Sequence, residues 1–417
     1  MKQTVLTIIT EIDFDKKEQL EGILSAIQGN LLGNVYIPFS SLSLLHFCSF
    51  VIIDNPGGPS LLIFENNFDG KLSEYLVELL EFAGKGIDQL YKCCKAYHSD
   101  DYDPEKLKEF LIKNVVNPNA YHIGNVGRAA KVVGENRQLR EKLEAYLDQL
   151  FVRSKPTDFP TDGIRKNIQA YLQDNVDPNL FNTLPPHQTF LERGMPWTWL
   201  TIAGLLAIII VIALLPVFLL LVYILRRHEE ADKPFTQPAS LDHVDVLMRT
   251  ENQISQNHLA SITAIKPGVF RLILLKIVLF ATNLLARTSN KGTLSGIPSI
   301  HFAHWSIINN KQLLFLSNFD GSWSSYLDDF IDKASRGLTG IWSNTVGFPK
   351  TRFLVLDGAT DELAFKAFAR GMQVPSLVWY SAYPDLTVQN IDKDSKIREG
   401  VLTDLSETDS KQWLKLF

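Results

Sequence analysis

The chain has 417 residues, 46% hydrophobic and 21% charged, which is enough for two or three domains with packed cores. The formal net charge is −5 and there is no long basic run, so the charge pattern typical of nucleic-acid-binding proteins is excluded. Three cysteines without metal-type spacing, Cys48, Cys93 and Cys94, argue against a disulfide framework and against a structural zinc site.

The first part of the chain alternates stretches typical of strands and of helices. The order is strand, helix, strand, strand, helix and strand, with one further helix before the last strand. The expected strands cover residues 4–12, 44–53, 61–65 and 121–133, and the expected helices cover residues 14–28, 71–83 and 104–113. This β-α-β-β-α-β order predicts a ferredoxin-like unit over residues 1–150.

A long apolar segment follows a connector that contains several prolines and covers residues 151–193. No charged residue lies between Arg193 and Arg226, and the stretch WTWLTIAGLLAIIIVIALLPVFLLLVYIL begins at residue 197. A bilayer crossing needs about 20 apolar residues. Residues 194–227 are therefore predicted to enter a lipid bilayer, with a kink at Pro216.

The flanking charges indicate an orientation. Arg226, Arg227 and Lys233 follow the segment, whereas Arg193 alone precedes it closely. The positive-inside rule then places the C-terminal flank in the cytoplasm. We expect a membrane protein whose soluble domains are cytoplasmic.

Three arrangements relative to the membrane remain open. The segment could dip into the bilayer and return near Pro216, or residues 269–286 could form a second crossing. Alternatively, each half could pair with its counterpart from another chain, which would make a homodimer. Within residues 269–286, the polar residues fall on one arc, which indicates an amphipathic helix packed on a sheet or lying in the interface. The residues on this arc are Arg271, Lys276, Thr282 and Asn283, together with Arg287, which directly follows the range.

The second half repeats the order of the first. After a polar linker at residues 228–257, strands are expected at 258–264, 300–308, 313–317 and 377–388, and helices at 270–286, 322–334 and 361–370. Asn309-Asn310 is expected to form the turn of a hairpin. A second ferredoxin-like unit is thus predicted over residues 258–400, followed by a tail at residues 401–417.

Equivalent residues recur in the two halves in the same order, as in LLIFENNFDGKLSEYL and LLFLSNFDGSWSSYL. The matched pairs are His46 with His301, Phe47 with Phe302, Asp69 with Asp320, Gly70 with Gly321, Tyr75 with Tyr326 and Gly86 with Gly337. Such a series indicates an internal duplication. The predicted fold class is α+β, with two ferredoxin-like repeats that pack as an α+β barrel and a membrane-inserted helical segment between them.

On this element order and duplication, residues 4–133 and 258–391 resemble the dimeric α+β-barrel superfamily in a fused, two-repeat form. The chain is distantly similar to the dye-decolourising peroxidases and chlorite-dismutase-like haem proteins of that superfamily. The resemblance implies haem as a cofactor and peroxide chemistry. The superfamily also includes cofactor-free monooxygenases and members without known activity.

The Asp-Gly pairs at Asp69 and Asp320 are candidate catalytic residues. The peroxidases carry a Gly-x-x-Asp-Gly motif whose aspartate serves peroxide chemistry, but Asn66 and Ser317 replace the leading glycine here. The alternative is structural: the glycine provides an unusual φ and the aspartate caps the helix that follows.

Four histidines are candidate haem ligands, because a neutral imidazole commonly binds haem iron. They are His46, His301, His304 and His122. Arg128, six residues after His122, is a candidate for assisting peroxide cleavage. The alternative is that the histidines are hydrogen-bonded core residues. No metal site is expected, and the sequence contains no hydrolase elbow, P-loop, HExxH or Rossmann fingerprint.

Two functions remain open from the sequence. The first is a membrane-attached, oxidative or peroxidase-like enzyme that acts on an apolar small molecule or a lipid. The second is a non-catalytic lipid-binding or scaffold module at the bilayer. Because a fold does not determine a function, the site has to distinguish between them.

Overall fold

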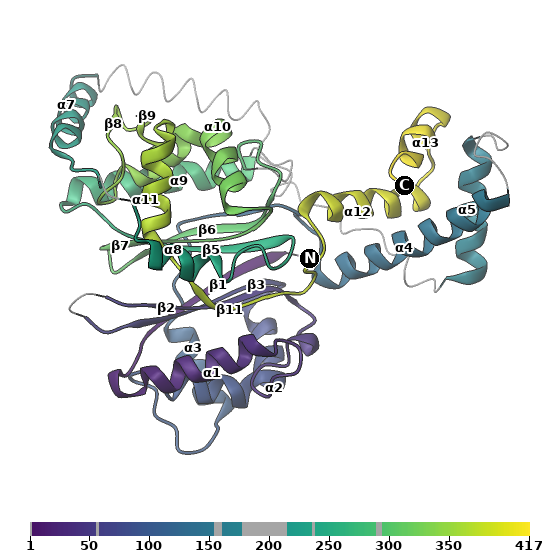
Figure 1. Cartoon of the computed structure of the whole chain (residues 1–417), viewed down its shortest axis with the longest axis horizontal. Helices are drawn as coiled ribbons and strands as arrows, with labels where there is room; N and C mark the ends of the chain where they lie inside the picture. Colours follow the sequence, from purple (N-terminus) through teal and green to yellow (C-terminus); the bar gives the residue numbers. More distant parts are fainter. Residues whose placement is uncertain (1, 56–57, 154–160, 177–214, 236–237, 289–293) are drawn as a thin grey trace.

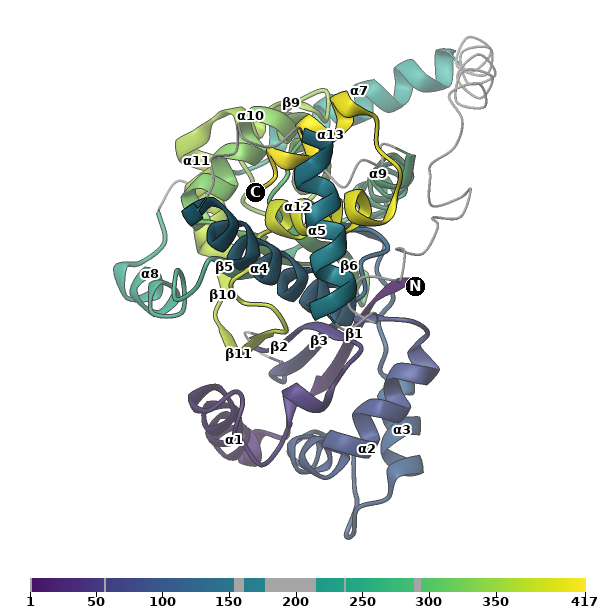
Figure 2. The ribbon, with the colours of Figure 1, turned by 90° about the vertical axis from the view of Figure 1, so that its right-hand side faces the viewer.

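The computed structural model describes residues 2–55, 58–153, 161–176, 215–235, 238–288 and 294–417. Two antiparallel sheets lie face to face in the middle of the molecule, and helices cover the outer face of each (Figure 1). A group of four helices lies beside one end of the sheets (Figure 2). The predicted α+β class is confirmed.

The two sheets are built from strands of both halves. The first sheet has the order β1 (Gln3–Glu11), β3 (Leu61–Asp69), β2 (Leu45–Ile53) and β11 (Ser376–Ser381). The second has the order β10 (Gln373–Val374), β5 (Gln256–Ala264), β7 (Gln312–Asp320), β6 (Ile300–Ile308) and β4 (Ala120–Ile123). A small separate hairpin joins β8 (Thr351–Arg352) and β9 (Leu356–Asp357).

Each half gives its last strand to the sheet of the other half. Val115 makes an isolated bridge to Ile8 of β1, and the chain then crosses so that β4 pairs with β6. In the second half, β10 pairs with β5, and β11 then pairs with β2 after Pro375. The sequence did not predict this exchange.

The predicted α+β barrel does not close within the described part of the chain. The two sheets remain separate, with β1 and β11 at the edges of one and β10 and β4 at the edges of the other. The crossing segments pair with each sheet in turn over only a few residues, so they connect the sheets without a continuous hydrogen-bonded ladder.

Successive side chains along each strand point to opposite faces of the sheet, and this alternation explains the layers of the fold. In β3, Leu62, Phe64 and Phe68 face the covering helices, whereas Leu61 and Ile63 face the other sheet. The helices on the first sheet are α1 (Lys17–Gly29), α2 (Leu72–Tyr91) and α3 (Pro104–Lys113), and those on the second are α9 (Val269–Thr288), α10 (Trp323–Trp342) and α11 (Glu362–Met372).

Two turns behave as the sequence predicts. Asn309 and Asn310 have φ values of 50° and 55°, which suit a two-residue hairpin between β6 and β7. Gly70 and Gly321 have φ values of 88° and 80°, a conformation that favours glycine, where each strand turns toward a helix.

The last strand of each half is shorter than predicted, and a helix follows it. β4 ends at Ile123 and β11 at Ser381, whereas strands were expected to continue to residues 133 and 388. The helices α4 (Ala130–Arg153), α5 (Thr161–Asn175), α12 (Val388–Leu402) and α13 (Glu407–Leu414) pack around a separate apolar core. The range predicted as a connector therefore contains α5, while residues 154–160 and 177–193 lie outside the described residues.

The predicted membrane segment lies mostly outside the described residues, which resume with α7 (Leu215–Ala231). Pro216 is the second described residue of α7, and the kink predicted there cannot be followed because residue 214 and those before it lie outside the described residues. The predicted polar linker contains the end of α7 and the short helix α8 (Leu241–Met248). Among the described helices, only α9 is long and apolar enough over Val269–Ala286 to cross a membrane by composition, with 17% of that window buried.

Candidate functional site

The interface between the sheets changes from apolar to polar along the strands. Val51, Ile63 and Leu314 belong to a small apolar cluster between the two sheets. Farther along β3, the inward positions carry Glu65, Asn67 and Asp69, because alternate residues share one face. Buried polar groups need partners within the protein, so these residues define where a site can lie.

Glu65 is the centre of this polar region. Its carboxylate accepts hydrogen bonds from His258 Nε2 at 3.0 Å, Ser49 Oγ at 2.9 Å and Asn67 Nδ2 at 3.0 Å, and His304 Nδ1 lies 3.5 Å away. Burial by itself would raise the pKa of Glu65, but the hydrogen bond and the charges of the two histidines outweigh it and lower the pKa to about 2. Glu65 is therefore a buried anion at neutral pH.

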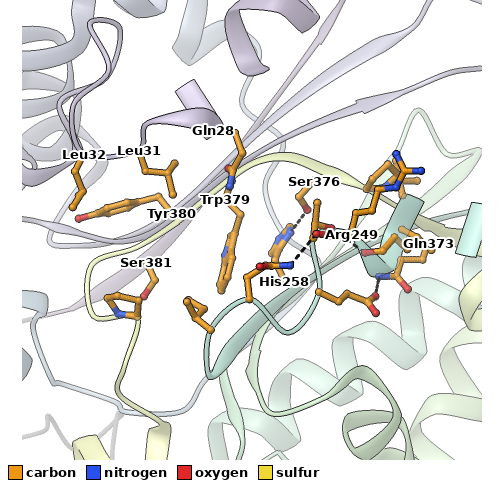
Figure 3. A pocket seen from close by; sticks show the side chains of 18 residues that line it. Gln28, Leu31, Leu32, Arg249, His258, Gln373, Ser376, Trp379, Tyr380 and Ser381 are labelled. Atoms are coloured by element: carbon orange, nitrogen blue, oxygen red, sulfur yellow. Dashed lines mark hydrogen bonds between the residues drawn. The ribbon is translucent and has the colours of Figure 1, made fainter. Parts of the chain in front are cut away.

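His258 connects Glu65 to the crossing strand β11. Its Nδ1 lies 2.6 Å from Ser376 Oγ, while its Nε2 faces Glu65. The three residues come from β5, β11 and β3, so the exchange of the last strand brings the serine to the histidine. Figure 3 shows His258 and Ser376 facing each other.

A pocket of about 560 Å³ opens onto this cluster. His258 and Ser376 line it together with Trp379, whose Nε1 donates to Asn318 Oδ1 at 2.8 Å and whose backbone N–H donates to Gln28 Oε1 at 2.9 Å. Further lining residues are Leu31, Leu32, Leu247, Arg249, Tyr380 and Ser381 (Figure 3). The wall is mainly apolar with a few polar groups, as in most small-molecule sites.

The predicted Asp-Gly aspartates form two equivalent pairs with buried histidines. His46 Nε2 lies 3.1 Å from Asp69 Oδ1, and His301 Nε2 lies 2.7 Å from Asp320 Oδ1. Tyr383 lies between the pairs and contacts His46 Nδ1 through its hydroxyl at 2.8 Å. Burial, followed by the charges of both aspartates, raises the pKa of Tyr383 well above its usual value.

The second oxygen of each aspartate caps a helix, but not the helix that was predicted. Asp69 Oδ2 accepts from Ala130 N–H of α4 at 2.7 Å, and Asp320 Oδ2 accepts from Val388 N–H of α12 at 2.8 Å. The adjacent helix α2 is capped instead at Lys71, whose backbone N–H donates to the Glu74 carboxylate. The aspartates thus hold the helical group against the ends of the sheets.

The remaining predicted site residues are dispersed. His304 contacts Thr7 Oγ1 at 2.9 Å and belongs to the Glu65 cluster; burial lowers its pKa although Glu65 opposes this. Burial also lowers the pKa of His122 to about 4, and its Nε2 makes no hydrogen bond within the described part of the chain. Arg128 pairs with Glu399 of α12 at 2.8 Å.

Haem would require an imidazole nitrogen that faces a cavity. His46, His301 and His304 already contact protein partners, and all four predicted ligands are buried. None of them lines the pocket next to His258. In this arrangement the four imidazoles do not fit a haem iron, and haem binding stays a prediction.

A second pocket, of about 630 Å³, lies between α7 and α9 and is lined almost entirely by apolar groups. Its walls include Phe218, Leu221, Leu225, Phe270, Ile273, Ile277, Phe353 and Leu354. Asp232 lies at the end of α7 and accepts from Arg271 at 2.7 Å and from Lys266 at 2.6 Å. These ion pairs hold the base of α9 against the protein.

The sequence analysis missed Glu65, His258 and Ser376. Glu65 interrupts the apolar run LLIF of a buried strand, which was the available signal for a functional residue. Ser376 carried no signal, because only the crossing of β11 brings it to His258. Comparisons with protein-family models, curated proteins and solved structures find no match to this chain.

Proposed function

We propose that this protein is a lipid-binding module that attaches to a membrane through α7 and α9. The observation that carries the proposal is that the apolar side chains of these two helices are exposed around a common pocket of about 630 Å³. Contiguous apolar surface of this kind is rare on soluble monomers and typical of membrane or ligand contact.

The orientation of α9 supports the proposal. Arg271 of this helix is 1% exposed and faces the protein, and Phe280 is 68% and Leu285 is 64% exposed. The exposed Lys276 donates to Asn310 Oδ1 at 2.9 Å. Leu275 and Leu279 on the inner face pack into the core of the second half. A helix with apolar residues on both faces needs an apolar environment on its outer side as well.

A short loop extends the same surface. Phe353 and Leu354 have φ values of 52° and 71°, and their backbone N–H groups donate to the buried carboxylate of Glu229 at 3.1 and 2.7 Å. Non-glycine residues in this conformation are strained, and such strain is typical of functional loops. Arg226 lies over the Phe353 ring at 5.2 Å, which suits a cation at the boundary between lipid and water.

Lipid acyl chains are the occupant that the sequence favours. The uncharged stretch that begins at residue 194 continues directly into α7, so the exposed apolar face adjoins the most hydrophobic part of the chain. Because the halves exchange strands, both must lie on the same side of the bilayer. We therefore propose monotopic insertion rather than a single crossing between two separated halves.

The predicted ferredoxin-like duplication belongs to the same proposal. It is supported by the equivalent His46–Asp69 and His301–Asp320 pairs and by equivalent stacking of Phe68 on Tyr75 and Phe319 on Tyr326. The peroxidase-like alternative stays a prediction, since its expected residues serve as helix caps and core contacts.

Lipid contact can be tested with single cysteines carrying an NBD fluorophore. The three native cysteines are buried, so a new surface cysteine reacts selectively. Ile277→Cys and Phe280→Cys probe α9, and Leu363→Cys, which is 83% exposed on α11, is the matched control. With phosphatidylcholine–phosphatidylserine vesicles containing doxyl lipids, we expect a blue shift and quenching on α9 only. Equal spectra at all three positions would contradict the proposal.

A further inference from the structure

We propose that Ser376 is a nucleophile activated by His258 and Glu65, and that the adjoining pocket binds the acyl part of a carboxylic ester for hydrolysis. This activity goes beyond lipid binding and does not depend on it, because the pocket at Ser376 and the α7–α9 pocket share no residue.

The contacts have the order that nucleophilic catalysis needs. Ser376 Oγ lies 2.6 Å from His258 Nδ1, and His258 Nε2 lies 3.0 Å from Glu65 Oε2. A nucleophile and the group that orients the base therefore each lie within hydrogen-bonding distance of the base. Either imidazole nitrogen can act as the base when the other carries the hydrogen.

Glu65 determines which tautomer His258 adopts. As a buried anion it can only accept, so His258 donates from Nε2–H and leaves the lone pair of Nδ1 facing the Ser376 hydroxyl. Ser49 and Asn67 fix the carboxylate in place. The same negative charge stabilises the imidazolium that forms when the serine proton is taken up.

The local backbone makes the serine accessible. Ser376 follows Pro375 where the chain crosses between sheets, and the register of β11 shifts between Ser376 and Val378. Such bulges occur frequently next to active sites because they redirect side chains. Ser376 is half-buried and lines the pocket, whereas the side chain of His258 is 2% exposed.

The pocket suits an apolar acyl chain. Leu31, Leu32 and Tyr380 form its apolar wall, and its volume of about 560 Å³ exceeds that of a short acyl group. Gln28 and Arg249 line the same pocket, and their N–H groups are suited to an oxygen that becomes negative during the reaction.

The reaction balances without a cofactor. Ser376 Oγ attacks the ester carbonyl carbon while its proton passes to His258 Nδ1. The tetrahedral intermediate collapses, the C–O bond breaks, and the alcohol leaves with that proton. Water then attacks the acyl-serine through the same histidine, so that ester and water become acid and alcohol.

A fluorophosphonate probe tests the nucleophile without knowledge of the substrate. The purified full-length protein is treated with the probe, and the adduct is located by peptide mass spectrometry. We expect the adduct on Ser376 in the unaltered protein and in Ser73→Ala, a control at an exposed serine of α2 that does not line the pocket. An absence of adduct at Ser376 in folded protein would overturn the proposal.

Hydrolysis of p-nitrophenyl esters with acyl chains of different length provides the second measurement. Ser376→Ala should lower kcat/KM at least about 100-fold and the control Ser73→Ala, at an exposed position of α2, less than about threefold, with unchanged thermal unfolding. Glu65→Gln tests the positioning role: kcat should fall about tenfold or more while KM stays constant. Hydrolysis that persists in Ser376→Ala would refute the assignment.

Discussion

The two halves of the molecule have equivalent residues at the ends of their central strands and different residues in the middle of their sheets. Both halves contain the His–Asp pair, and in both the aspartate caps the helix after the last strand. Four residues before the aspartate, however, the first half has Glu65 and the second has Leu316. His258, whose strand partner is Asn318, takes the place that Val5 holds opposite Asn67.

This difference distinguishes the residues that stabilise the fold from the residues of the candidate sites. Features present in both halves, such as the capping aspartates, hold helices against the sheets. The Ser376–His258–Glu65 cluster occurs where the halves differ, and so does the exposed apolar face of α9. The corresponding helix α1 buries Leu20, Leu24 and Ile27 and exposes charged residues instead.

The largest loss of stability is expected when His258 of the second half is replaced by valine, the residue at the equivalent position of the first half. His258→Val leaves the Glu65 carboxylate buried without its main partner, which should lower the free energy of unfolding by about 3–5 kcal/mol. Urea unfolding measures this. The double variant with Glu65→Leu makes the two positions apolar and should recover most of the loss. A double variant as unstable as the single one would show that the ion pair is not the cause.

Stability should also fall on acidification, through His122. Its pKa is about 4 in the folded protein against an ordinary value of 6.5, so the unfolded chain binds the proton first as the pH falls. The stability that the neutral His122 contributes is fully present above pH 6.5. It is lost as the pH falls from 6.5 to about 4, and the total loss is about 3 kcal/mol. His122→Phe should flatten the dependence in that range; an unchanged slope would contradict the assignment.

Glu65 adds a separate loss at lower pH. Its folded pKa of about 2 lies below its ordinary 4.5, so its stabilisation is present above pH 4.5 and disappears as the pH falls toward 2. Comparing Glu65→Leu/His258→Val with the unaltered protein over this range isolates the effect. Parallel unfolding curves below pH 4.5 would argue against a buried anion.

A smaller and symmetric effect is expected at the shared aspartates. Asp69→Ala and Asp320→Ala each remove the acceptor of a helix N-terminus, which should cost about 1–2 kcal/mol in either half. Thermal or urea unfolding of the two variants gives the comparison. A loss confined to one half would mean that the pairs are not structurally equivalent.

The smallest effect on stability is expected on the outer face of α9. Ile273→Glu and Ile277→Glu should change the free energy of unfolding by less than about 0.5 kcal/mol, because both side chains are exposed. The same variants should release α9 from lipid in vesicle-quenching measurements. Leu275→Glu, a substitution at a buried position of the same helix, should unfold the second half instead.

Much of the fold could be predicted from local patterns. The strands near residues 44–53 and 300–308, the helix at residues 104–113 and the Asn309-Asn310 turn agree closely with β2, β6, α3 and the observed hairpin. The starts of α4 and α12 were missed because their caps, Asp69 and Asp320, lie 61 and 68 residues away in the chain. No local signal reports such a distant partner.

The candidate site was beyond the reach of sequence patterns for the same reason. Ser376, His258 and Glu65 are separated from one another by 118 and 193 residues. The predicted histidines were correctly expected on strands, but whether each faces a partner or a cavity depends on the packing of the other sheet.

By itself, the sequence determined the alternation of strands and helices, the repeated order of elements and the position of the uncharged apolar run, because periodicity and composition act within a few residues of the chain. Only the tertiary structure decided that the last strands exchange between sheets, that the aspartates cap distant helices and that a serine meets a histidine and a buried glutamate. These contacts join residues far apart in the chain, and their energies depend on burial and on partners that local sequence does not specify.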